Sequence, residues 1–361
     1  MSVKVSIIMG AYNGEDYLEE TMESILAQTY QNWECIVIND CSTDQTAEIL
    51  ESYAKRDPRV KVYHNETNLR LPATLNRALD LAEGEYVARM DADDICRKDR
   101  LEKQVAFMDA HPELALCSCR LMNMPPDQII PTNLHRRTGA DIVKAMFLFF
   151  QPINHPGVMA RKADMAALRY DPHYSCTEDL DLWTRMIYSG RNITVMDDYF
   201  HLYRQHSNQV TVTYSEKQRE QYREIIRAFY RKMMFELNEE ELEFLEKGIY
   251  FREYMDIERY LAFIKKVFQT NKEKKCFSEE AVQYAAFEVL MAYRGDYGLE
   301  KKQFLKALSA FSPTFVGREF VRRRKAYQKS LQDAKIAADM FGFVLQEPAD
   351  RIPVYIRKKS E

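Results

Sequence analysis

The chain has 361 residues, of which 46% are hydrophobic and 29% charged, which is enough apolar material for one or two well-packed domains. This composition excludes a disordered chain, a collagen and a small disulfide scaffold. The formal net charge is −4, but residues 301–361 carry an excess of Lys and Arg that includes the run Arg322–Lys325.

The first third of the chain alternates short β-branched runs with amphipathic segments, a pattern typical of β-α-β units and a parallel sheet. Strands are predicted over Val3–Met9, Glu34–Asn39, Val60–His64, Tyr86–Met90 and Leu114–Cys119. Helices are predicted over Glu15–Gln28, Thr46–Tyr53, Ala73–Ala82 and Arg100–Ala110, with Gly84 as a helix stop.

The next elements are shorter and less regular. They are a Pro- and Asn-rich loop over Asn123–Asn133, a helix near Asp141–Phe149, a strand near Val158–Ala160, a helix over Glu178–Ser189 and a closing strand over Ile193–Met196. Beyond Tyr214 the pattern becomes nearly continuous helix to about residue 345. We therefore predict an α/β domain over residues 1–214 and an all-helical region with a basic tail over residues 215–361.

The cysteines and the lengths of the apolar runs indicate the cellular compartment of the protein. The seven cysteines are odd in number and include no C-x-x-C pair, which favours reduced thiols in a cytoplasmic protein. The apolar stretch Val5–Met9 is too short for a signal peptide, and no run approaches the roughly 20 apolar residues of a membrane span. We expect a cytoplasmic protein, either soluble or peripheral on the inner face of the membrane.

Polar residues follow three of the predicted strands, at the sheet edge where open parallel sheets bind their ligands. The three segments are Gly10–Gly14, Asn39–Asp44 and Asp91–Asp94. None of them contains a G-x-G-x-x-G or Walker A sequence, which argues against a dinucleotide dehydrogenase and a P-loop enzyme.

Three carboxylates crowd into four residues at Asp91, Asp93 and Asp94. Two like charges about 4 Å apart repel by roughly 4 kcal/mol at an effective dielectric of 20, so a cation is expected there. Magnesium or manganese uses one or two carboxylates together with substrate phosphates, and such a metal would neutralise a leaving diphosphate. The alternative is a solvated acidic turn in which Asp94 or Asp99 caps the following helix.

Four segments in the same order resemble the family 2 glycosyltransferases with the GT-A fold. They are the stretch from Val5 to Leu50, GEYVARMDADD, CTEDLDLWTRM and YRQHSNQV. The resemblance covers roughly residues 3–212 and implies a Rossmann-like, mixed but mostly parallel sheet flanked by helices. It also implies an inverting, nucleotide-sugar-dependent enzyme. The Q-x-x-R-W motif of processive members is absent, which argues against processive synthesis.

The resemblance implies a nucleotide site at the first two strand ends. Ala11, Tyr12, Asn13 and Asp40 are expected to contact the nucleoside, with Asp40 accepting from the uracil ring of a UDP-sugar. Arg70 is expected to approach the nucleotide from the third helical segment. Two structural alternatives remain: Tyr12 packs on the sheet, and Asp40 or Ser42 caps the following helix.

The resemblance also implies the metal ligands. Asp91 contacts the ribose or the metal, Asp93 is the principal ligand, and His206 approaches the metal or the diphosphate. A lone histidine is otherwise a surface or core residue.

The Glu178-Asp179 pair begins a helix, where neighbouring side chains point about 100° apart, so only one of them can face the sugar. The resemblance assigns Asp179 as the general base. With an unperturbed pKa near 3.9, Asp179 is ionised at neutral pH and can take a proton from the acceptor hydroxyl. Such a base implies a single displacement with inversion. The alternative, which suits Glu178, is stabilisation of the helix N-terminus.

These inferences predict a metal-dependent glycosyltransferase that uses a nucleotide sugar, expected to be a UDP-sugar, and a glycan or lipid-linked acceptor in surface polysaccharide biosynthesis. The helical region would bind the acceptor, form a homodimer or attach to an anionic membrane through the basic tail. We expect no nucleic-acid partner, and the tail is alternatively a solvated helix face. Competing hypotheses are nucleotidyl transfer or phosphohydrolysis, and a non-enzymatic nucleotide-sugar-binding or scaffold protein that works through its helical half.

Overall fold

Buried apolar runs form the strands of one mixed sheet. The computed structural model describes residues 4–126, 128–133, 136–206, 215–254, 256–346 and 352–357. Its strands are β1 (Val5–Ala11), β2 (Trp33–Asn39), β3 (Val60–His64), β4 (Tyr86–Arg89), β5 (Ile95–Cys96), β6 (Leu114–Met124), β7 (Gln128–Pro131), β8 (Met159–Arg161), β9 (Asn192–Arg204), β10 (Phe343–Gln346) and β11 (Val354–Arg357).

The sheet order is β10-β11-β7-β6-β8-β4-β1-β2-β3. The strands β4, β1, β2 and β3 are parallel, and β8 runs antiparallel between β4 and β6. Strand β9 pairs in parallel with β6 and in antiparallel with β5. The carboxyl ends of β1, β2 and β4 therefore meet at one edge, as the sequence predicts.

Amphipathic segments form helices on both sides of this sheet. In the first part of the chain they are α1 (Leu18–Leu26), α2 (Thr46–Arg56), α3 (Arg70–Leu81), α4 (Arg100–Ala110), α5 (Ala140–Met146), the 3-10 turn η1 (His155–Gly157), α6 (Lys162–Leu168) and α7 (Glu178–Tyr188). The later helices are α9 (Ser215–Lys232), α10 (Glu239–Glu243), the π-helix η2 (Phe244–Tyr250), α11 (Ile257–Lys274), α12 (Glu279–Tyr297), α13 (Lys301–Leu308) and α14 (Pro313–Met340). No helix in the described ranges has both the length and the apolarity that crossing a membrane requires.

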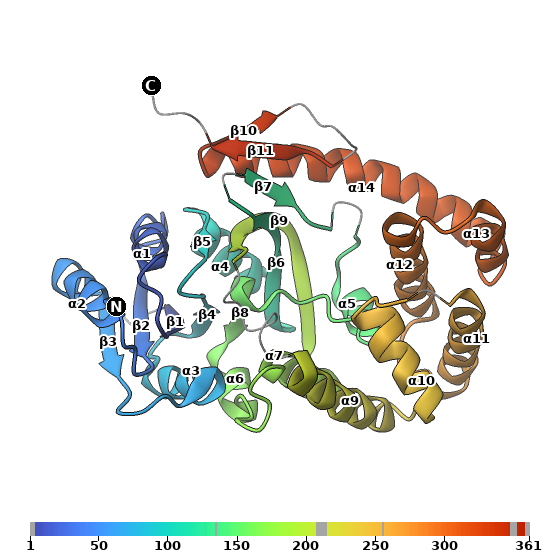
Figure 1. Cartoon of the computed structure of the whole chain (residues 1–361), viewed down its shortest axis with the longest axis horizontal. Helices are drawn as coiled ribbons and strands as arrows, with labels where there is room; N and C mark the ends of the chain where they lie inside the picture. The colour runs from blue at the N-terminus through green and yellow to red at the C-terminus, as the bar shows by residue number, and fades with distance from the viewer. Residues whose placement is uncertain are drawn as a thin grey trace.

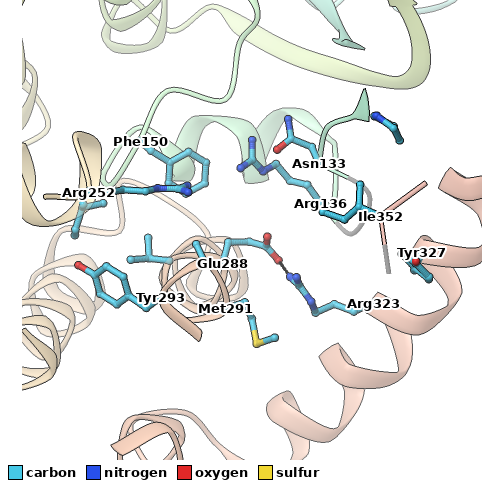
Figure 2. Close-up of a pocket in the computed structure, with 14 residues that line it drawn as sticks. Asn133, Arg136, Phe150, Arg252, Glu288, Met291, Tyr293, Arg323, Tyr327 and Ile352 are labelled. Carbon is cyan, nitrogen blue, oxygen red and sulfur yellow. Dashed lines mark hydrogen bonds and ion pairs between the residues drawn. The ribbon is translucent and has the colours of Figure 1, made fainter. Parts of the chain in front are cut away.

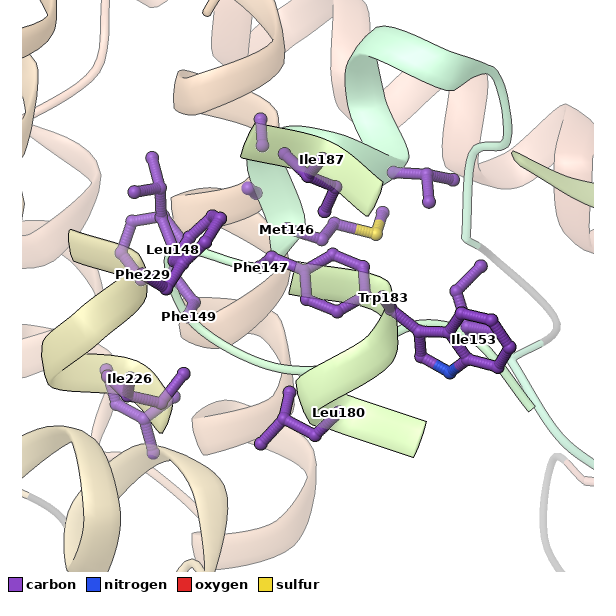
Figure 3. Packing of buried hydrophobic residues seen from close by; sticks show 14 of the residues in the cluster. Met146, Phe147, Leu148, Phe149, Ile153, Leu180, Trp183, Ile187, Ile226 and Phe229 are labelled. Atoms are coloured by element: carbon purple, nitrogen blue, oxygen red, sulfur yellow. The ribbon is translucent and has the colours of Figure 1, made fainter. Parts of the chain in front are cut away.

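The helical half packs against the α/β half through a shared core. Figure 3 shows Trp183 of α7 and Phe147, just after α5, within the same packed cluster as Ile226 and Phe229 of α9. Helices α10 to α13 lie on the side away from β3, and α14 runs along β7, β10 and β11 (Figure 1). The last described strand, β11, pairs with β7 and so joins the far end of the chain to the sheet.

Four expectations about elements need correction. The loop over Asn123–Asn133 is instead the β6–β7 hairpin, and the closing strand runs on to Arg204. The C-terminal region is helical through α14 but ends in the β10–β11 hairpin, which the sequence does not predict. Gly84 is not a helix stop, because α3 ends at Leu81; a Cβ on Gly84 would lie 2.6 Å from the backbone N of Ser6, so glycine allows a close approach to β1.

Candidate functional site

The loop after β1 is fixed by the loop after β2. The backbone N–H of Asn13 donates to Ser42 Oγ (3.0 Å), and the N–H of Thr43 donates back to Asn13 Oδ1 (2.9 Å). Ala11 is buried in register with Asn39 of β2. Tyr12 is 53% exposed, so it does not pack on the sheet and its ring is available to a ligand.

Asp40 is a buried carboxylate that organises the start of α3. Its Oδ1 accepts from Asn65 Nδ2 (2.6 Å) and from the N–H of Leu69 (2.8 Å), and its Oδ2 accepts from the N–H of Arg70 (2.9 Å). The alternative that Asp40 caps the following helix, α2, is therefore wrong: its carboxylate accepts from backbone N–H groups at the start of α3. Arg70 has a positive φ of 67°, and its side chain is exposed beside this carboxylate.

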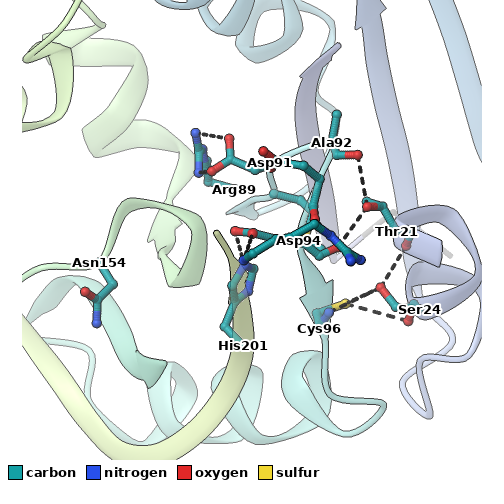
Figure 4. A network of polar contacts seen from close by, with 12 residues as sticks. Thr21, Ser24, Arg89, Asp91, Ala92, Asp94, Cys96, Asn154 and His201 are labelled. Atoms are coloured by element: carbon teal, nitrogen blue, oxygen red, sulfur yellow. Dashed lines mark hydrogen bonds and ion pairs between the residues drawn. The ribbon is translucent and has the colours of Figure 1, made fainter. Parts of the chain in front are cut away.

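The three aspartates after β4 converge at the same sheet edge. One carboxylate oxygen of each of Asp91, Asp93 and Asp94 lies within 4.8 Å of the others. Asp91 forms an ion pair with the buried Arg89 (Figure 4). Asp93 Oδ2 lies 2.8 Å from His206 Nε2, so the fold brings together the histidine and the aspartate that the sequence assigns to the metal.

Asp94 differs from the other two because both of its oxygens already have partners. Oδ2 lies 2.8 Å from His201 Nε2, with both side chains fully buried, and Oδ1 accepts from the N–H of Arg204 (2.9 Å). Burial raises the pKa of Asp94 and lowers the pKa of His201, which favours an uncharged pair. The capping alternative is wrong for Asp94, whose carboxylate holds β9. Asp99 does occupy the N-cap position of α4, but its carboxylate pairs with Arg97 and makes no capping hydrogen bond.

The cluster fits a divalent cation. Burial raises the pKa of both Asp91 and Asp93. The charge of Arg89 only partly offsets the rise at Asp91, to which Asp93 adds, and the charge of Asp94 adds to the rise at Asp93, which His206 partly offsets. Carboxylate oxygens are hard donors that suit magnesium and manganese, and a cation would relieve this repulsion. Because Asp94 is occupied, Asp91 and Asp93 are the carboxylates left to ligate.

The carboxylate pair at the start of α7 divides into one buried and one accessible group. Glu178 is buried, with Oε1 3.7 Å from His155 Nδ1, whereas Asp179 is half-buried. Asp179 Oδ2 accepts from Gln151 Nε2 (2.6 Å), and its Oδ1 accepts from the N–H of Leu180 (2.7 Å). Asp179 is thus the member of the pair that can meet a substrate.

Burial changes the protonation of both carboxyls. It raises the pKa of Glu178 to about 8, with the charge of Asp179 as the second cause, so Glu178 is neutral at pH 7 and does not stabilise the helix N-terminus as an anion. Burial also raises the pKa of Asp179, while the hydrogen bonds from Gln151 and the Leu180 N–H and the charge of Arg89 oppose the rise. The expectation of an unperturbed Asp179 is wrong for this reason.

Arg89 joins the two carboxylate groups, and the sequence analysis did not identify it. Its guanidinium pairs with Asp91, its charge also acts on Glu178 and Asp179, and its buried Nε has no partner among the described residues. An arginine inside the predicted strand Tyr86–Met90 could have indicated a nearby carboxylate, since a buried guanidinium requires an anion. Gln151 gave no such signal, because nothing local ties residue 151 to Asp179.

Comparison with known proteins supports a single family. A family model described as "Glycosyl transferase family 2" matches residues 6–166. EpsE of Bacillus subtilis, which is named a glycosyltransferase, is 37% identical over 191 residues, covering 52% of this chain and 68% of EpsE. TuaG of the same organism, named for teichuronic acid biosynthesis, is 47% identical over 104 residues, covering 29% of this chain and 41% of TuaG.

Solved structures share the fold. The crystal structure of Staphylococcus aureus TarS 1–349 in complex with UDP-GlcNAc has a TM-score of 0.54 and 21% identity, and the match covers 91% of this chain and 92% of that one. The mannosyltransferase PcManGT of Pyrobaculum calidifontis, solved in complex with GDP-Man and Mn²⁺, has a TM-score of 0.50 and 18% identity and covers 92% and 88% of the two chains.

Proposed function

The chain belongs to glycosyl transferase family 2, and from this membership we propose that it transfers a sugar from a UDP-sugar to a hydroxyl group of a glycan or lipid-linked acceptor. Its sheet and flanking helices have the GT-A fold, which confirms the resemblance seen in the sequence. Family membership supports transferase activity over the scaffold and phosphohydrolase hypotheses. One observation carries the proposal: the aspartate cluster and the accessible Asp179 lie around the same buried cation, Arg89.

The donor nucleotide is proposed to lie at the ends of β1 and β2. Tyr12 offers an exposed aromatic face to a base, and Ala11 and Asn13 shape the loop beneath it. Asp40 is fixed beside Arg70, where its second carboxylate oxygen has one N–H donor and can accept from an imide N–H. The choice of UDP follows the TarS complex with UDP-GlcNAc.

A divalent metal, manganese or magnesium, is proposed to be held by Asp91, Asp93 and His206. The carboxylate oxygens of the aspartates and the imidazole nitrogen of His206 are suitable ligands, and the PcManGT complex contains Mn²⁺. When bound, such an ion neutralises the charge that develops on a leaving diphosphate. The residues of the chain supply its position: Arg89 orients Asp91, and His206 faces Asp93.

Asp179 is proposed as the general base. Its carboxylate is oriented by Gln151 and by the Leu180 N–H, and one edge is accessible. It would take the proton of the acceptor hydroxyl while that oxygen attacks the anomeric carbon and the diphosphate leaves from the opposite face, which inverts the configuration.

The biological setting is also a proposal. The relative TuaG is named for teichuronic acid biosynthesis, which supports a role in surface polysaccharide synthesis. We place this synthesis at the cytoplasmic face of a membrane. We assign catalysis to residues 1–214 and acceptor, homodimer or membrane contacts to residues 215–361. Residues 207–210 of the fourth motif and the boundary at residue 214 lie outside the described residues.

Thermal stability in the presence of nucleotides tests the donor site. The native protein is heated with UDP, GDP, CDP and TDP, each with and without manganese. A ligand at 100 times its dissociation constant stabilises the fold by about 2.7 kcal/mol, so we expect a manganese-dependent shift with UDP. Asp93→Asn should lose the manganese dependence. Asp80→Asn, which alters a surface ion pair with Arg169, is the matched control and should keep it. Absence of a shift with every nucleotide would contradict the proposal.

A further inference from the structure

A cavity of about 510 Å³ lies between the α/β half and the helical half, away from the loops assigned to the donor. Its walls come from the end of β7 and the residues after it, the segment after α5, η2, α12 and α14. Figure 2 shows Phe150 and Met291 among the lining side chains. The volume falls within the range of about 300 to 1,000 Å³ that small-molecule sites occupy.

The charged side chains of this cavity are mostly cationic. Its described lining includes three arginines, Arg136, Arg252 and Arg323, against one carboxylate, Glu288. Glu288 is already engaged in an ion pair with Arg323. The remaining positive charge suits a ligand that carries an anionic group.

Arg136 forms no ion pair with any of the described residues. Its guanidinium lies over the ring of Phe150, 4.7 Å from the ring centroid, and its Nε is buried without a hydrogen-bond partner among the described residues. No carboxylate within the described part of the chain lies within 4.0 Å of its nitrogens. A guanidinium that has a buried, unpartnered nitrogen and no ion pair is costly, so this geometry indicates that the anion comes from a ligand.

The cavity adjoins the proposed base through two pairs of consecutive residues. Phe150 lines the cavity, and the next residue, Gln151, donates to Asp179. Ile249 also lines the cavity, and the next residue is Tyr250. Burial raises the pKa of Tyr250, and the charge of Asp179 is the second cause, so Asp179 is close enough to Tyr250 to act on it. Gln151 Oε1 is buried and lacks a partner among the described residues, so it is free to accept from a ligand hydroxyl.

We propose that this cavity binds an acidic acceptor: Arg136 holds a carboxylate or phosphate group of the acceptor while one of its hydroxyls reaches Asp179. The apolar wall formed by Val289, Met291 and Ala292 contacts the uncharged part of the same molecule. The inference rests on the proposed function, since it names the substrate class for the acceptor side of that site.

Calorimetric titration of the full-length protein at constant ionic strength tests the inference. The probes are glucose, glucuronate and glucose 6-phosphate, in the presence of UDP and manganese. Removal of a charged hydrogen bond weakens binding by about tenfold or more, so both charged sugars should bind at least tenfold more tightly than glucose. The stronger of the two charged sugars identifies carboxylate or phosphate as the natural group.

Three variants localise the binding. Arg136→Gln should weaken the binding of charged sugars by about tenfold or more. Glu288→Gln should strengthen it, because the substitution removes the one carboxylate among the described lining residues. Arg322 lies on the same helix as Arg323 but forms its ion pairs with Glu280 and Glu319. Arg322→Gln is therefore the matched control and should bind charged sugars as the native protein does.

Equal binding of glucose and the charged sugars, or unchanged binding in Arg136→Gln, would overturn the inference. If Arg136→Gln does not fold, Glu288→Gln decides: unchanged or weaker binding of charged sugars overturns it. Titration of UDP with manganese on the same preparations separates the two proposals. UDP binding without a preference for charged sugars refutes the acidic acceptor alone, whereas absence of UDP binding by the native protein refutes the donor site.

Discussion

At the residue scale, the site depends on one buried cation between two groups of acids. Arg89 pairs with Asp91 and also opposes the rise in the pKa of Asp179. Without it, the carboxylates would repel one another in surroundings that screen charge poorly. Arg89 therefore positions the proposed metal ligand and keeps the proposed base able to ionise.

The Glu178-Asp179 pair gives a prediction with a built-in control. Asp179→Asn removes the proposed base and should lower sugar transfer by about 10² to 10⁴, while UDP still binds. Glu178→Gln should transfer at close to the native rate at pH 7, because glutamine resembles the neutral glutamic acid that a pKa of about 8 implies. Both rates are obtained from release of the nucleoside diphosphate.

The same glutamate predicts how stability depends on pH. Its pKa rises from an ordinary 4.5 to about 8 on folding, so between these values the folded state holds a proton that the unfolded state has lost. The free energy of unfolding should fall as pH increases through this window and level off above pH 8. Glu178→Gln should lack this component, and identical pH profiles for the two proteins would argue against a buried neutral Glu178.

Side chains could be proposed from the sequence where each lies in a recognisable motif. Asp93, His206 and Asp179 were proposed in this way, and the fold places His206 against Asp93 although the two are 113 positions apart. A partner outside every motif was not found: His201, 107 positions from Asp94, pairs with it only because β9 runs beside β5. The raised pKa of Glu178 depends on burial, which the sequence does not specify.

At the element scale, α14 has two faces with different chemistry. One face pairs with α12, through Arg322 to Glu280 (3.0 Å) and Arg323 to Glu288. The opposite face exposes Val321, Arg324 and Lys325 to solvent. The first half of the basic run, Arg322 and Arg323, therefore forms ion pairs within the protein. The second half, Arg324 and Lys325, is available to an anionic membrane.

This division predicts which charges matter for membrane binding. Arg324→Glu with Lys325→Glu should weaken co-sedimentation with anionic vesicles by at least about tenfold at low salt, since each basic residue near such a surface contributes about 1 kcal/mol. Lys301→Glu with Lys302→Glu, two exposed lysines of α13, is the control with the same charge change and should bind as the native protein does. Equal binding by both double variants would show that α14 does not mediate attachment.

Elements could be predicted where the pattern is long and buried. The strands β1 to β4 and helices α2, α4 and α7 lie within a few residues of their expected bounds. The β6–β7 hairpin was missed because Pro125 and Pro126 favour a loop. Strands β10 and β11 are short and partly exposed at a sheet edge, and their pairing depends on β7, far away in the sequence.

At the scale of the whole molecule, the C-terminal segment returns to the sheet. A cluster of buried residues joins Met122, Tyr199 and Leu202 of the sheet to Ala334 and Phe343 of the last helix and hairpin. Arg357 also pairs with Glu20 at 3.1 Å. Removal of residues 318–361 would therefore expose this core, so point substitutions are the better test of the basic tail, and the division at residue 214 remains a prediction.

The arrangement of the two halves explains why the sequence suggested residues for the donor side and none for the acidic-acceptor cavity. The donor loops follow β1, β2 and β4 within one stretch of chain, so their motifs lie close together in the sequence. The acidic-acceptor cavity combines Arg136, Phe150 and Glu288 with Arg323, and these residues meet only after the helical half packs on the sheet (Figure 2).

The central claim is that Asp179 activates an acceptor for a single displacement on the donor bound beside Asp91 and Asp93. NMR spectroscopy of the product formed from an α-linked UDP-sugar tests this most directly, because the configuration of the new glycosidic bond reports the number of displacements. The account predicts a β linkage, with no product formed by Asp179→Asn. An α linkage would mean retention of configuration and would contradict the assignment of Asp179 as the base of an inverting transfer.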